Sequence, residues 1–172
     1  MPNQVPTNLP FPLANGYIDH WLATDSVAVS VENLEQFSKT NLKSQIAEHL
    51  YDANSGVIDN PVELATFQPP GAETELTWQM TTCDVDHFVN RSVFYHTCRH
   101  LRSWAYTILD SPISQTATLT LTTNGPADVW LNGVHAHRRL HFAHQIPDSS
   151  SFAVDLTNGQ NHLSVSYTHL RA

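Results

Sequence analysis

The chain has 172 residues, of which 41% are hydrophobic and 14% are charged, so its composition is that of a folded domain and excludes a disordered segment. The formal net charge is −8, and Lys39 and Lys43 are the only lysines. This balance argues against nucleic acids and anionic membrane surfaces, because both are bound through clustered Lys and Arg. A neutral ligand such as a sugar is compatible with it.

The first residues, 1–6, have neither the basic stretch nor the apolar run of a signal peptide, and no apolar segment approaches membrane-spanning length. The sequence as written predicts a cytoplasmic protein, or a secreted one whose targeting segment has been trimmed. Residues 1–16 are rich in Pro, Asn and Gly, which predicts an extended N-terminal arm. Residues 17–172 are predicted to form a single β-sandwich domain, because no repeat or low-complexity linker divides them.

The first half of this domain combines short strands with one helix. Leu42, Ile46 and Leu50 recur every fourth residue, which predicts a helix from Leu42 to Tyr51 with Asn41 as its N-cap. β-Branched and aromatic residues in rough alternation predict strands over 17–23, 26–31, 62–67, 76–80, 88–95 and 101–109.

The second half alternates strands and turns and leaves almost no room for a helix. Thr and Leu alternate over 116–122, and this period of two predicts a strand with one buried and one solvated face. Asn124-Gly125-Pro126 ends that strand, and a new strand is expected over 127–131. Asn132-Gly133 then predicts a hairpin, because both residues tolerate the positive φ of a type I′ turn.

A further strand pair is predicted over 152–156 and 162–167, joined around Asn158-Gly159. Strands and turns therefore recur to the end of the chain. The fold class predicted from the sequence is all-β, an antiparallel β-sandwich with one short helix.

Two motifs in this half resemble those of a known family. Trp130-Leu131-Asn132-Gly133 matches a Trp-x-Asn-Gly hairpin, and residues 156–163 match a Leu-x-x-Gly-x-Asn-x-Leu strand pair. Both resemble the jelly-roll, galactose-binding-like accessory domains attached to many glycoside hydrolases and polysaccharide lyases, over residues 104–167. The resemblance implies a non-catalytic carbohydrate-binding or structural domain that is a piece of a larger enzyme, with no catalytic residue of its own.

The same resemblance implies that the partner is the catalytic module of the parent chain, a glycoside hydrolase, with glycan as the ligand. Some domains of this class hold a structural calcium, but no residue here matches a calcium motif, so no cofactor is expected. Candidate binding loops lie at one end of the sandwich, over residues 52–60, 110–115 and 143–150.

A second hypothesis comes from the histidines, of which there are eleven. A regular strand after Gly133 would direct a set of side chains to one face: His135, His137, Arg139 and His141. His-x-His on a strand can place the imidazoles of His135 and His137 on one divalent metal ion, with His141 or His144 in support. This predicts a small metal-dependent, cupin-like enzyme. The cupin pattern fails in detail because no acidic residue follows until Asp148, and solvated histidines are the competing interpretation.

Other chemistry-bearing residues have structural interpretations. Asp84 and Asp86 are a carboxylate pair of the kind that glycosidases use, but they also suit a solvated turn or an oxygen-ligand calcium site. Cys83 and Cys98 are expected to be buried free thiols, with one disulfide as the alternative. The four tryptophans lie in predicted strands and are expected in the core: Trp21, Trp78, Trp104 and Trp130.

Overall fold

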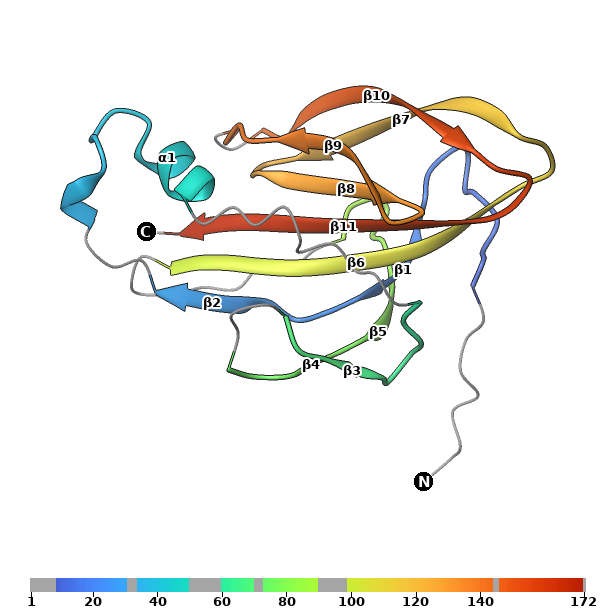
Figure 1. The fold of residues 1–172 in the computed structure, drawn as a ribbon, viewed down its shortest axis with the longest axis horizontal. Coiled ribbons are helices and arrows are strands. Elements are labelled where there is room, and N and C mark those ends of the chain that lie inside the picture. The colour runs from blue at the N-terminus through green and yellow to red at the C-terminus, as the bar shows by residue number, and fades with distance from the viewer. Residues whose placement is uncertain are drawn as a thin grey trace.

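A large antiparallel sheet and a two-stranded antiparallel ribbon form a β-sandwich in the computed structural model (Figure 1). The structure describes residues 9–30, 34–49, 60–69, 73–89, 99–143 and 146–171. The large sheet has the order β5-β1-β6-β11-β8-β9, and β2 also pairs with β6. Its strands are β1 (His20–Ala23), β2 (Val27–Ser30), β5 (Gln79–Thr82), β6 (Arg99–Ser111), β8 (Ala127–Leu131), β9 (Val134–Arg139) and β11 (Gly159–Arg171). The all-β, antiparallel fold class predicted from the sequence is confirmed.

The ribbon pairs β7 (Gln115–Thr123) with β10 (Asp148–Leu156) along their whole length. A small hairpin, β3 (Thr66–Phe67) with β4 (Leu76–Thr77), completes the strands of the described residues. The helical elements are η1 (Leu34–Gln36) and α1 (Leu42–His49). Among the described residues no helix is long and apolar enough to cross a membrane.

Strands β6 and β11 are the spine of the large sheet, because they pair over all thirteen residues of each, from Ser111↔Gly159 to Arg99↔Arg171. Apolar clusters cover both faces of this sheet. The sandwich core, between the sheet and the ribbon, centres on Val129, Leu131, Val154 and Leu163. The second core, on the opposite face, centres on Leu22, Leu76, Trp78, Trp104 and Tyr106.

The N-terminal arm packs on this framework where it is described. Leu9 lies against the second core, and Phe11 stacks on His20 with ring centroids 4.3 Å apart. Ala14 and Tyr17 then exchange both backbone hydrogen bonds across a turn in which Asn15 and Gly16 have positive φ. This turn explains why β1 begins at His20 and not at Tyr17, where the sequence pattern placed the strand.

Helix α1 begins at Leu42, as predicted, and buries Ile46 completely. Residues 50–51, where the helix was predicted to end, lie outside the described residues. Asn41 has φ 58°, which is not the extended conformation of an N-cap. Instead, the Gln45 side chain accepts a hydrogen bond from Ser38 N and donates one to Thr40 O.

Two of the short predicted strands are interrupted. The backbone of Trp78 pairs with Leu64 and Ala65, which separates β4 from β5 and divides the strand predicted over 76–80. The strand predicted over 62–67 shrinks to β3, because Val62 to Ala65 form a turn that is closed by the hydrogen bond from Ala65 N to Val62 O. A strand was also predicted over 88–95. Residues 88–89 belong to no strand, and residues 90–95 lie outside the described residues.

The predicted pair over 152–156 and 162–167 is wrong, because its two strands belong to opposite sheets. β10 pairs with β7, whereas β11 pairs with β6 and β8. Gly159, at φ 94°, lies in the corner between the sheets. Asn161 is fully buried there and fixes the corner.

The side chain of Asn161 makes hydrogen bonds on both sides of this corner. Its Oδ1 accepts from Thr157 N (2.8 Å) and from Asn132 Nδ2 (3.0 Å), and its Nδ2 donates to Thr157 O (2.8 Å) and Gly159 O (3.0 Å). Asn132 and Gly133 form the predicted hairpin between β8 and β9, with φ 51° and 78°. The two motifs named above thus meet at one corner and serve the fold.

Candidate functional site

His135 and His137 lie on opposite faces of the large sheet, so the prediction that they share a face is wrong. A β-bulge shifts the register of β9 against β8, and His135 pairs with Trp130 while His137 pairs with Val129. Val129 and Trp130 are neighbours on one strand and point to opposite faces. The extra residue, Ala136, packs on the sandwich core. The two imidazoles are therefore not brought to one metal ion.

On the face of the second core, His135 belongs to a charged cluster around Asp128. Asp128 Oδ1 lies 2.8 Å from His135 Nε2 and 3.1 Å from Arg138 Nε. Burial raises the pKa of Asp128 above its ordinary value, and the hydrogen bond with His135 opposes this rise. Asp128 is buried, and the imidazole and the guanidinium both satisfy its Oδ1 within the fold, so we interpret this cluster as structural.

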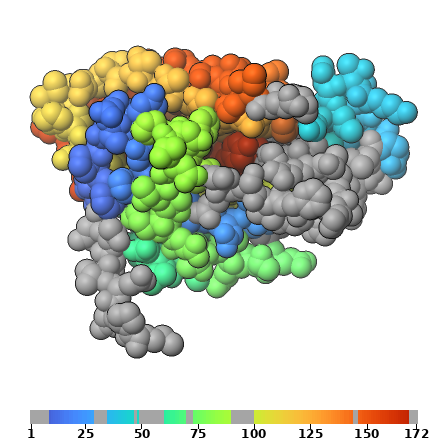
Figure 2. Space-filling view, turned by 180° about the vertical axis from the view of Figure 1, so that it is seen from behind, coloured from blue at the N-terminus to red at the C-terminus, as the bar shows by residue number. Residues whose placement is uncertain are grey.

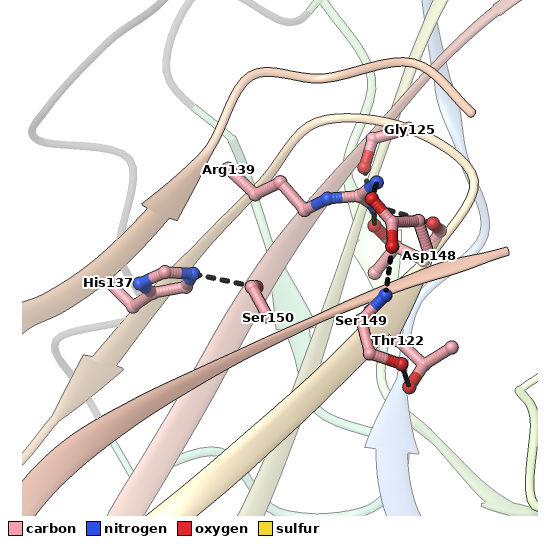
Figure 3. Close-up of polar contacts among 8 residues, drawn as sticks. Thr122, Gly125, His137, Arg139, Asp148, Ser149 and Ser150 are labelled. Carbon is pink, nitrogen blue, oxygen red and sulfur yellow. Dashed lines mark hydrogen bonds and ion pairs between the residues drawn. The ribbon is translucent and has the colours of Figure 1, made fainter.

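On the other face, His137 and Arg139 connect β9 to the ribbon, as Figure 3 shows. His137 Nε2 lies 2.9 Å from Ser150 Oγ, and its ring stacks on Phe152. Arg139 is buried and donates to Thr123 and to a carboxylate oxygen of Asp148 at 3.1 Å. These contacts hold β10 against β9.

The next candidates from the sequence are two carboxylates, Asp84 and Asp86, and the two cysteines. Asp84 and Asp86 lie in an exposed turn, in which Asp84 O accepts from His87 N and Asp86 Oδ1 accepts from Phe88 N. Cys83 is a free thiol, and burial raises its pKa to about 11, with the nearby carboxylate of Asp19 adding to the rise. Cys98 lies outside the described residues.

The tryptophans occupy the core, as predicted. Trp78, Trp104 and Trp130 are buried, and Trp21 is half-buried and donates from Nε1 to Ile18 O at 2.8 Å. None of the three buried rings is available as a flat platform for a sugar. His141 is exposed, and His144 lies outside the described residues. In the described part of the chain, no group of three or more His, Cys, Asp or Glu could hold a metal ion.

The most site-like arrangement is a cluster that the sequence did not single out, formed by Tyr17, Asp19 and His87. The rings of Tyr17 and His87 stack with centroids 3.8 Å apart and planes within 1°. His87 Nδ1 lies 2.8 Å from Asp19 Oδ1, which fixes the imidazole from its edge while Tyr17 holds it from its face. Tyr17 is 52% exposed although its ring stacks on His87, so about half of this residue is accessible to solvent.

The backbone under this cluster is held in an uncommon conformation. His87 has φ 64°, a region that residues other than glycine seldom occupy. The turn hydrogen bond from His87 N to Asp84 O, at 2.9 Å, and the side-chain contacts keep it there. Cys83 N also donates to Asp19 O at 2.8 Å, which joins the two segments. Such strained positions cluster at functional sites, where the pose of a side chain matters.

The chemistry of the cluster suits a neutral ligand with many hydroxyl groups. Aromatic faces accept the C–H faces of a sugar ring, and carboxylates such as Asp19 accept hydrogen bonds from hydroxyls. Asp84 and Asp86 add exposed acceptors on the same turn as His87. The cluster contains no Lys or Arg, so it is not suited to an anionic ligand.

The candidate loops proposed from the sequence do not contain the residues of this cluster. Residues 112–114 connect β6 to β7, with Ile113 exposed, and residues 146–147 precede β10, whereas 144–145 lie outside the described residues. Residues 52–59 are not described. Asp19 and His87 are 68 residues apart, so no local pattern links them. The one available signal was Asn15-Gly16, a turn dipeptide that places Tyr17 at a loop end.

No protein-family model matches this chain, and no curated protein is similar to it. The fold and the geometry of the Tyr17–Asp19–His87 cluster are therefore the basis for a functional proposal.

Proposed function

We propose that this chain is a non-catalytic, carbohydrate-binding accessory domain of a larger carbohydrate-active enzyme, and that it binds glycan at the Tyr17–Asp19–His87 cluster. The observation behind the proposal is the half-exposed Tyr17 ring, stacked on an imidazole that a carboxylate holds in place. Binding residues favour loops on a rigid scaffold, and this cluster lies at the start of β1 and in the turn after β5.

Preorganisation supports this function. A ring fixed before the ligand arrives loses less conformational entropy on binding than a free side chain does. Tyr17 is held by a backbone bridge to Ala14 and by its stack on His87, so its orientation is set in the free protein. The resemblance of residues 104–167 to galactose-binding-like, jelly-roll accessory domains supports the same class of function and a catalytic module as the partner.

The proposal is tested on a glycan array with the wild-type chain and two variants. Tyr17→Ala removes the stacking ring, and we expect its affinity for retained glycans to fall by about tenfold, which corresponds to ~1.4 kcal/mol of lost contact. Ile113→Ala removes an exposed apolar side chain from the 110–115 loop and serves as the matched control, with affinity unchanged. Retention of no glycan by the wild type, or equal binding by Tyr17→Ala, contradicts the proposal.

A further inference from the structure

The outer face of the β7–β10 ribbon is a ladder of hydroxyl groups. Thr120 Oγ1 lies 2.8 Å from Ser151 Oγ, and Thr122 Oγ1 lies 2.8 Å from Ser149 Oγ. Thr116 Oγ1 donates to Asp155 Oδ1 at 2.8 Å. The face therefore carries a regular row of small hydroxyl side chains, which shield the strand backbone less than long side chains would.

The two edges of this ribbon differ in what protects them. β10 carries Asp148 and Asp155, and its side chains contact β9 through His137–Ser150 and Arg139–Asp148. In the part of the chain that the structure describes, β7 pairs with no strand except β10. Figure 2 shows the yellow to light-orange atoms of this part of the chain on the surface, along one rim of the molecule.

The open strand lacks the features that normally prevent edge-to-edge association. Proteins protect edge strands with Lys, Pro or β-bulges. β7 contains no charged residue and no proline, and its nine-residue pairing with β10 has no bulge. Its core-facing residues, Ala117, Leu119 and Leu121, are partly buried against the sandwich core.

The sequence of β7 is complementary to itself. Around Leu119, an antiparallel pairing of two copies by a two-fold axis places Thr116 opposite Thr122 and Thr118 opposite Thr120. Ala117 then meets Leu121, and Leu119 meets its own copy. Threonines lie on the outer face and apolar residues on the core face of both copies, and cross-strand Thr–Thr pairs stabilise a sheet.

We propose that β7 is a dimerisation edge, which pairs with β7 of a second copy of this chain and joins the two ribbons into one four-stranded sheet. The pairing satisfies the free backbone groups of β7 and covers Leu119 and Leu121 in both copies. An isologous contact of this kind closes at two copies and does not propagate into a fibre. The inference does not depend on the proposed glycan site, which lies on other elements.

The test is the molar mass of the full chain in solution, measured by light scattering after size exclusion from about 1 μM to about 1 mM chain. The variant Thr118→Lys/Thr120→Lys places lysines opposite each other across the two-fold axis. We expect its dimer dissociation constant to rise at least tenfold, because like charges directly opposite destabilise a strand pair. Thr118→Lys/Thr120→Glu places Lys opposite Glu at both pairs and should restore the dimer.

A matched control adds the same charge to the other strand of the ribbon. Ser151→Lys/Ala153→Lys lies on the same outer face, opposite Thr120 and Thr118, but away from the two-fold seam. This control should remain a dimer, and all variants should keep the circular dichroism spectrum of the wild type. A wild-type monomer at every concentration overturns the proposal, and so does a dimer that the double-lysine variant leaves intact.

Discussion

Replacement of Asn161 by alanine should destabilise the fold more than any change at an exposed turn residue. Asn161 is fully buried and makes four side-chain hydrogen bonds of 3.0 Å or less, to Thr157 N, Thr157 O, Gly159 O and Asn132 Nδ2. Each such bond contributes about 1 kcal/mol net. The loss should therefore be about 4 kcal/mol, a large part of the ~5–15 kcal/mol that stabilises a typical domain.

The assay is urea unfolding followed by tryptophan fluorescence, together with a thermal scan. A loss of about 4 kcal/mol should lower Tm by roughly 8–16 °C for a chain of this size. Asn158→Ala is the matched control at an exposed position of the same corner, and it should change the free energy of unfolding by less than about 0.5 kcal/mol. A loss below about 1 kcal/mol in Asn161→Ala would refute the role assigned to this corner.

Three further predictions concern packing, protonation and thiol chemistry. Gly125→Ala should lower the free energy of unfolding by about 2 kcal/mol or more, because the new Cβ would clash with the backbone oxygen of Thr168; chemical denaturation measures this loss, and an unchanged midpoint would contradict the packing. Burial, with repulsion from Arg102 as the lesser cause, lowers the pKa of His100 from 6.5 to about 4, so protonation opposes folding. The stability present above pH 6.5 should therefore be lost as the pH falls toward 4. The free energy of unfolding should fall by about 3 kcal/mol more in the wild type than in His100→Gln, and equal losses in the two proteins would contradict this role of His100. The raised pKa of Cys83 should make its thiol slow to react with iodoacetamide at pH 8 in a Cys98→Ser background, whereas labelling as fast as in the unfolded chain would contradict its burial.

The sequence pattern predicted the strands that alternate cleanly and the Asn132-Gly133 hairpin. β7 is an example, because its Thr and Leu residues alternate from 116 to 122 and the pattern depends only on local geometry. The Asn132-Gly133 hairpin is another, for the same reason. The partner of β10 was not predictable in this way, because Asn158-Gly159 signals a change of direction and does not say to which sheet the next strand goes.

One predicted pair of residues was wrong and the Tyr17–Asp19–His87 cluster was missed, each for a physical reason. The bulge at Ala136, which separates His135 from His137, has no glycine to mark it and follows from how β9 fits the sandwich core. The contact between Asp19 and His87 joins positions that only the pairing of β1 with β5 brings together. A sequence pattern reports neighbours along one strand, whereas this cluster depends on neighbours across strands.

The most direct test of the proposed function is an NMR titration of the wild-type chain with each glycan that the array retains. The aromatic ring resonances of Tyr17 and His87 are followed, with the buried Trp78 as an internal reference. We predict that the Tyr17 and His87 resonances shift with the same saturation curve while the Trp78 resonances stay in place. Saturable binding that leaves both Tyr17 and His87 unshifted would contradict it.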